Sequence, residues 1–285
     1  MVFLHPLATL VYYISVIGLT MIINNPICTG IAIVGSLVHL IMVKGTDNMG
    51  KTAIMLIPMV LITAAINPLF SHEGVTVLGV FPSGNILTLE SVLYGLNMSA
   101  ILLAVVLWFV SVNVIMTAER IRYVLGRVFP VLALTFSMTL HFIPRIRKHI
   151  IKVSEVKRVM YGNGANSLKN RITGLTQSFT WILNDSVDTA DSMRCRGYGL
   201  AGRSSYSRYI FRTTDGIWIG LVIILTAYVI WGVLGDHIYW QYYPYVKCGY
   251  NGFSTISVYI AYVMLCLLPT LTLIKASDEK GTVRA

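Results

Sequence analysis

The chain has 285 residues, of which 55% are hydrophobic and only 12% are charged, and its formal net charge is +10. Because soluble domains carry about 25% charged residues, this composition excludes an ordinary soluble domain and indicates a polytopic membrane protein. Four scattered cysteines without a CxxC pair predict neither a zinc site nor a disulfide framework; they are Cys28, Cys195, Cys248 and Cys266.

Charge-free apolar runs predict about six membrane-spanning helices in an all-α protein. They lie at 7–23, 28–43, 52–70, 93–116, 217–235 and 254–274. A span needs ~20 residues, so most runs qualify and 28–43 is marginal. The first residues lack the basic region and the cleavage site of a signal peptide, and we therefore expect the first run to be retained as a span.

The segments between these runs differ in charge. Segment 44–51 has two lysines, whereas 71–92 has the acids Glu73 and Glu90 and no basic residue. Segment 237–253 has one lysine among many aromatic residues, as expected at a membrane interface. Since basic segments stay in the cytoplasm, the pattern predicts six crossings with both termini cytoplasmic.

Most of the positive charge lies in one region between the fourth and fifth spans. Sixteen of the 22 basic residues fall within 119–212, against five acids. The positive-inside rule explains this excess, and no nucleic-acid-binding motif accompanies it, so we expect no nucleic-acid partner. We divide the chain into N-terminal spans (1–117), a basic helical region (118–213) and C-terminal spans with a short tail (214–285).

The basic region is predicted to be helical and amphipathic. The apolar run 128–143 would be about 24 Å long as a helix, short of the ~30 Å core, and basic residues flank both its ends. We expect a helix in or under the membrane, or one covered by a partner; a seventh span is the alternative. Basic residues predict a helix over 145–160, and an apolar stripe of helical period predicts another over 171–196.

Other motifs are weak. Residues 45–52 match the phosphate-binding pattern G-x-x-x-x-G-K-[ST], but they lie between two spans without a surrounding α/β domain, which favours a short turn. His39 lies within a span, where a hydrogen-bonded imidazole is the simpler interpretation. His72 and Glu73 are too few to predict a metal site. We expect no catalytic residue, cofactor or metal.

The segment 191–199 (Asp-Ser-Met-Arg-Cys-Arg-Gly-Tyr-Gly) is the most informative in the chain. Arg194 and Arg196 place two fixed positive charges at the negative C-terminal end of a helix, and Gly197 is expected to end it. On the aqueous side of a membrane protein, such an end is suited to docking into another protein.

Residues 188–199, with their continuation to 212, look like the Ala-Arg-Gly coupling segment of a known family. Further similar strings occur at 4–7 (Leu-His-Pro-Leu), 67–76 (Asn-Pro-Leu-Phe-Ser-His-Glu-Gly-Val-Thr) and 90–95 (Glu-Ser-Val-Leu-Tyr-Gly). Over nearly its whole length, the chain resembles the transmembrane T component of energy-coupling factor (ECF) transporters, a family that includes cobalt and nickel transporter subunits.

The resemblance implies a non-catalytic subunit in a prokaryotic cell membrane, which couples two ABC-type ATPase subunits to a small substrate-binding membrane subunit for uptake of a vitamin or related micronutrient. It implies that the apolar surface near 128–143 reorients the substrate-binding subunit. It also implies two ATPase-coupling segments, whose residues are Arg194, Cys195, Arg196 and Gly197, and Lys157, Arg158, Met160, Tyr161 and Gly162.

Two departures from the family pattern bear on these segments. In the second segment, Cys195 replaces the usual alanine. The first segment has no arginine at the expected place, so that either Lys157 or Arg158 takes the role of that arginine, or the segment docks by its shape alone. A dedicated cobalt or nickel system and an autonomous secondary carrier remain the alternative functions. The near absence of ionisable residues in the spans disfavours the carrier.

Overall fold

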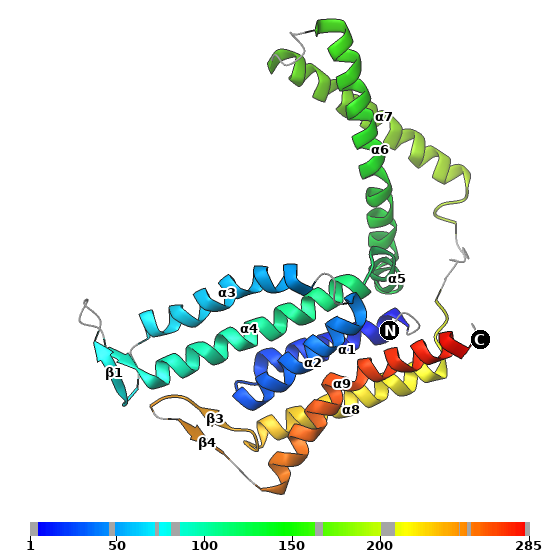
Figure 1. Ribbon diagram of the computed structural model, residues 1–285. Helices are drawn as coiled ribbons and strands as arrows, with labels where there is room; N and C mark the ends of the chain where they lie inside the picture. Colours follow the sequence, from blue (N-terminus) through cyan, green and yellow to red (C-terminus); the bar gives the residue numbers. More distant parts are fainter. Residues whose placement is uncertain are drawn as a thin grey trace. The chain divides into compact units, whose positions relative to one another are not determined.

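The structure is a computed structural model, and it describes residues 5–45, 49–71, 74–80, 86–162, 168–200, 209–244, 246–249 and 252–282. The chain forms two compact units (Figure 1). One contains Met1–Arg120 and Tyr209–Ala285, and we call it the membrane unit; the other, Ile121–Arg208, is the basic unit. The basic unit lies within the predicted coupling region 118–213.

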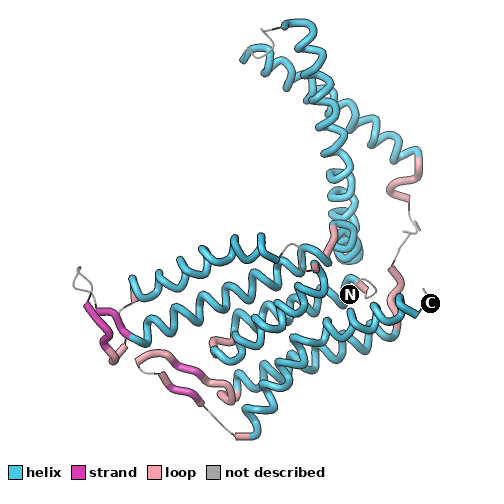
Figure 2. The backbone as a smooth tube through the Cα atoms, in the orientation of Figure 1, coloured by secondary structure: helices cyan, strands magenta, loops and turns pink. Residues whose placement is uncertain are grey.

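Helices dominate the membrane unit (Figure 2). They are α1 (Pro6–Ile22), α2 (Pro26–Lys44), α3 (Met49–Phe70), α4 (Leu89–Ile115), α8 (Thr213–Leu234) and α9 (Phe253–Thr282). All six predicted apolar runs are therefore helical. Within the described residues, four helices are long and apolar enough to cross a membrane: α2, α4, α8 and the Phe253–Thr270 part of α9.

The run 28–43, which is marginal by its length in the sequence, is part of one of these four. Helix α2 begins at Pro26 and ends at Lys44, so it has 19 residues. In contrast, Pro6–Ile22 and Ile54–Phe70 are shorter apolar helices. The chain is thus a helical membrane protein by length and composition, whereas six crossings remain a prediction.

The start of α2 shows how the sequence fixes a helix boundary. Pro26 is at the first helical position, and the Oδ1 of Asn25 accepts a hydrogen bond from the Ile27 amide at 2.9 Å. The Nδ2 of the same asparagine donates to the Ile238 carbonyl at 3.3 Å and to the Tyr259 hydroxyl at 3.1 Å. Asn25 therefore caps the start of α2 and ties it to the α8–α9 connection and to α9.

Aromatic side chains form the centre of the membrane unit. Tyr12 of α1 and Trp108 of α4 are fully buried and pack edge to face, with ring centroids 6.1 Å apart. Tyr262 of α9 belongs to the same cluster, and its hydroxyl lies 3.1 Å from the Oγ1 of Thr20. Because lipid provides no hydrophobic drive between helices, such packing and hydrogen bonds hold the bundle together.

Small residues let the helices approach one another closely. A Cβ added at Gly95 of α4 would lie 2.7 Å from the backbone oxygen of Ala64 in α3. One added at Gly232 of α8 would lie 2.6 Å from a methyl carbon of Val258 in α9. These contacts are typical of helix packing within membranes, where glycine brings backbones together.

The expectation of an all-α chain is incomplete, because two short antiparallel hairpins occur in the connections. Strand β1 (Val77–Val80) pairs with β2 (Ile86–Thr88), and β3 (Trp240–Gln241) pairs with β4 (Lys247–Cys248). They lie outside the apolar runs, where periodicity gave no helical signal. The first hairpin leads into α4, whose first turn is capped by the Oγ1 of Thr88.

The basic unit contains most of α5 (Ala118–Val128), together with α6 (Pro130–Tyr161) and α7 (Leu168–Cys195). The prediction of separate helices over 128–143 and 145–160 is wrong: both stretches belong to the 32-residue α6, which continues through Pro144. Proline removes one backbone hydrogen bond but does not end this helix. Helix α6 is not among the four candidate spans. The prediction of a helix over 171–196 is confirmed within three residues by α7.

Candidate functional site

The end of α7 is closed by a well-defined hydrogen-bond pattern. The amide of Tyr198 donates to the Met193 carbonyl at 3.0 Å, and the amide of Gly197 donates to the Arg194 carbonyl at 2.9 Å. Gly197 has a φ of 81°, in the left-handed region that glycine adopts without strain. Together these features form a Schellman motif, so the prediction that Gly197 ends this helix is confirmed.

The side chains at this end are accessible. Arg194, Cys195 and Arg196 are exposed, and Gly197 is half-buried. Arg194 lies 3.9 Å from Asp191, but both side chains are more than 60% exposed, at 79% and 67%. Water and salt screen such a pair strongly, so it contributes little to stability. No ion pair of Arg196 occurs within the described residues. This end therefore presents two cations beside the negative pole of the helix.

The end of α6 is closed differently. Gly162 has a φ of 51°, and its amide donates to the Arg158 carbonyl. Arg158 and Met160 are exposed, whereas Lys157 is half-buried and its side chain lies against α7. A Cβ added at Gly174 would be 3.1 Å from the Lys157 Nζ. Of the two basic residues in this candidate coupling segment, Arg158 is thus the more accessible one.

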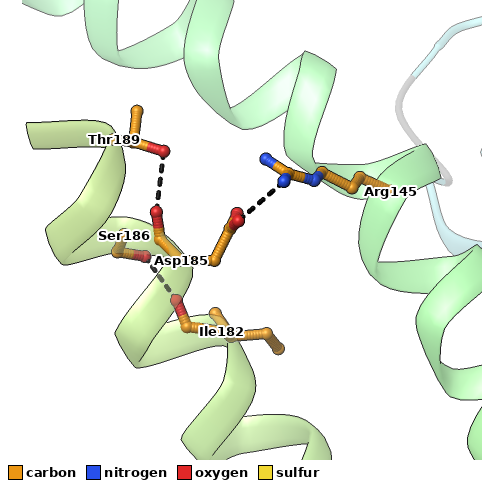
Figure 3. A network of polar contacts seen from close by, with 5 residues as sticks. All are labelled: Arg145, Ile182, Asp185, Ser186 and Thr189. Atoms are coloured by element: carbon orange, nitrogen blue, oxygen red, sulfur yellow. Dashed lines mark hydrogen bonds and ion pairs between the residues drawn. The ribbon is translucent and has the colours of Figure 1, made fainter. Parts of the chain in front are cut away.

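Helices α6 and α7 are joined by a cluster that the sequence did not predict. The Nη2 of Arg145 lies 2.7 Å from the Oδ1 of Asp185. Figure 3 shows this ion pair between the two helices. The guanidinium also lies over the Trp181 ring, 5.6 Å from its centroid. On the same indole, the His149 ring stacks at a centroid distance of 3.9 Å and an interplanar angle of 6°. We call these four residues the α6–α7 clamp.

Burial makes Asp185 the central residue of the clamp. Its side chain is only 12% exposed, whereas that of Arg145 is 58% exposed. The Oδ2 of Asp185 is buried and has no hydrogen-bond partner in the described part of the chain. Arg145 is therefore the cation that compensates this carboxylate, and losing it would leave the carboxylate with neither a partner nor full hydration. The clamp thereby fixes the two helices whose ends carry the candidate coupling segments.

Sequence reasoning missed the clamp because its members are distant along the chain. The three-residue steps of Asp185, Asp188 and Asp191 mark one face of α7. They do not show that Asp185 is the one of the three that pairs with a cation of another helix within the described residues. The basic character of 145–160 gives no means of choosing Arg145 among its neighbours. Only the packing of α6 on α7 distinguishes them.

Of the other residues singled out in the sequence, the structure describes His39. His39 is fully buried; its Nε2 lies 2.9 Å from the Tyr13 hydroxyl, while its Nδ1 has no partner among the described residues. Among the described residues, no group of three or more His, Cys, Asp or Glu side chains lies close enough together to hold a metal ion. His72, Glu73 and residues 46–48 of the phosphate-loop-like segment lie outside the described residues, as does 201–208.

Comparison with known proteins gives no family assignment. No protein-family model matches the chain, and no curated protein matches it.

Proposed function

We propose that this chain is the membrane coupling subunit of an ECF-type transporter, passing ATP-driven movement from two ABC-type ATPase subunits to a small substrate-binding membrane subunit. The observation that supports it best is the end of α7, where Arg194 and Arg196 are exposed beside a glycine-closed helix end. A helix end of this kind fits a groove that holds an acidic side chain, to which Arg196 donates charge-assisted hydrogen bonds.

The division of the chain also supports the proposal. The membrane unit carries the candidate spans, and the basic unit carries both candidate coupling segments on two helices that the clamp joins. Movement at either helix end is therefore passed to the other helix. In the proposed machine, the α6 end, with Arg158, Met160, Tyr161 and Gly162, docks on the second ATPase. The first turns of α6, within 128–143, contact the substrate-binding subunit.

The test is affinity purification of the tagged chain from its native membrane, followed by identification of the proteins that co-elute. We expect a pair of ATPase subunits and a small membrane protein. Arg196→Glu should remove the ATPases while the chain still inserts, because losing one partner of a buried pair costs about 3–5 kcal/mol. The matched control is Arg147→Glu, at an exposed cation in the middle of α6, which should retain them.

Two outcomes separate the alternatives. Solute uptake by the purified chain alone in liposomes would overturn the proposal in favour of an autonomous carrier. Co-purified subunits that drive uptake of cobalt or nickel, and of no organic micronutrient, would identify the dedicated metal system while leaving the coupling role in place. If the Arg196→Glu variant retains both ATPases, the proposed role of Arg196 in docking is refuted.

A further inference from the structure

The β1–β2 hairpin is fixed to the first turn of α4 (Figure 1). Strand β2 ends at Thr88 and α4 begins at Leu89, so no residue separates them. The Leu89 amide donates to the Thr76 carbonyl at 3.0 Å. The hydroxyl and the amide of Thr76 both donate to the Glu90 carboxylate, at 2.7 and 3.3 Å. Because α4 is long and apolar enough to cross a membrane, the hairpin lies where this helix emerges from it.

The polar groups at this junction are turned inward. Glu90 is 3% exposed, Thr88 is 1% exposed and Ser91 is fully buried. The Oγ1 of Thr88 accepts a hydrogen bond from the Ser91 amide at 3.4 Å, and the Ser91 hydroxyl donates to the Ser71 carbonyl at 2.8 Å. The carboxylate and the hydroxyls are therefore satisfied within the protein, and they do not need water around the hairpin.

The surface that the hairpin turns outward is apolar. Large apolar side chains are between 43% and 69% exposed at Val75, Val77, Leu78 and Ile86. The sequence from 74 to 89 has no charged residue. Ile86 and Leu87 are consecutive in β2, so both faces of the ribbon carry apolar side chains. An antiparallel ribbon in water has a polar face, and a cluster of exposed apolar side chains marks a surface that contacts something other than water.

A lipid bilayer accounts for this surface better than a docked protein. A protein partner covers one side of a ribbon, whereas lipid contacts every side of an element that enters it. Helix α4 has 27 residues and is therefore ~40 Å long, so it extends beyond the ~30 Å hydrocarbon core into the interfacial regions. A two-stranded ribbon has open edges, whose backbone groups need water or head groups as partners. The boundary between head groups and acyl chains meets both requirements.

We propose that the β1–β2 hairpin is a membrane anchor that lies at this boundary, with its backbone among the head groups and its exposed apolar side chains among the acyl chains. Its partner is the lipid surface itself, without selection of anionic lipids, because the segment offers no cation to attract them. Through the hydrogen bonds from Thr76, the anchor holds the start of α4 at one depth. It is independent of the ATPase-coupling segments, since the hairpin belongs to the membrane unit.

The test measures what surrounds Leu78 in the full-length chain, reconstituted in vesicles of palmitoyl-oleoyl-phosphatidylcholine. A nitroxide is attached to Leu78→Cys, with serine at Cys195 and Cys248, the exposed cysteines of the described residues. Electron paramagnetic resonance then compares collisions with oxygen, which concentrates in lipid, and with a water-soluble nickel chelate. Leu96→Cys, at an exposed residue about 10 Å along α4, is the lipid reference. Lys247→Cys, at an exposed cation of the second hairpin, is the water reference.

We expect the ratio of oxygen to nickel collisions at Leu78 to exceed that at Lys247 several-fold and not to exceed that at Leu96. A ratio equal to that at Lys247 would place the hairpin in water and overturn the proposal. Exclusion of both reagents, in the chain alone or with its co-purified proteins bound, would show a protein covering the hairpin and would overturn it equally. Should Leu78→Cys lose the thermal unfolding of the parent chain, Val75→Cys, 69% exposed, carries the same expectation.

Discussion

Replacing Gly197 tests whether the closure of α7 sets the position of Arg196. Gly197 has a φ of 81°, and a Cβ at this position would lie 3.1 Å from the Cδ1 of Leu200. For an L-residue the left-handed conformation costs roughly 1–2 kcal/mol, and more for a β-branched one. Gly197→Val should therefore open the motif and release the hydrogen bond from Tyr198 to Met193. Gly197→Asn is the control, because asparagine tolerates this conformation.

The assay is amide hydrogen exchange of the full chain in detergent, followed at Tyr198 and at the end of α7. A loss of about 1.4 kcal/mol corresponds to tenfold faster exchange when opening is rapid. We expect at least this acceleration for Gly197→Val and little change for Gly197→Asn. ATPase co-purification should fall in the same order. If Gly197→Val leaves both exchange and co-purification unaltered, the inference that the glycine closure positions Arg196 is refuted.

Three further predictions concern stability, each measured by thermal unfolding or hydrogen exchange in detergent. Arg145→Ala should destabilise the α6–α7 pairing more than Asp185→Ala, because it leaves the buried Asp185 carboxylate unpaired at a cost of about 1–3 kcal/mol. Equal effects of the two variants would contradict the burial of Asp185. Gly95→Val should loosen α3 from α4, because the backbone oxygen of Ala64 cannot rotate away; normal stability would show that the helices are not in close contact. Asn25→Ala should lower the free energy of unfolding by about 2 kcal/mol or more, because it removes a helix cap and two tertiary hydrogen bonds. The loss of a cap alone costs at least about 0.5 kcal/mol. A smaller loss would therefore show that the two tertiary hydrogen bonds contribute nothing.

The helices of the membrane unit could be predicted well, because hydrophobicity and helix boundary signals are local properties. Pro26 after Asn25 and Gly197 after Arg196 each mark a boundary that the structure shows. The hairpins could not be predicted in this way. Strands as short as Trp240–Gln241 depend on a partner across a turn, and two residues are too few to show a period.

The continuous α6 and the contacts between α6 and α7 could not be predicted from the sequence. The change from the apolar run 128–143 to the basic stretch 145–160 predicted two helices, yet one helix of 32 residues, α6, continues through Pro144, which removes only one backbone hydrogen bond. The pairing of Arg145 with Asp185 joins residues 40 positions apart, and the charge pattern offered several equivalent cations. Arg145 differs from the other cations in its contact with the largely buried Asp185, and only the packing of α6 on α7 creates that contact.

The two candidate coupling segments differ in how firmly their ends are held. The α7 end is closed by two hydrogen bonds of a Schellman motif, with a glycine in the left-handed region and two exposed arginines beside it. The α6 end is closed by an ordinary helical hydrogen bond from Gly162 to Arg158. Of its two cations, Lys157 lies against Gly174 of α7. A rigid end loses less conformational freedom on binding, so directional recognition by a charge-assisted hydrogen bond is better served at α7. We therefore expect the α7 end to determine the register of docking, and the α6 end to contribute mainly through the surface around Arg158 and Met160.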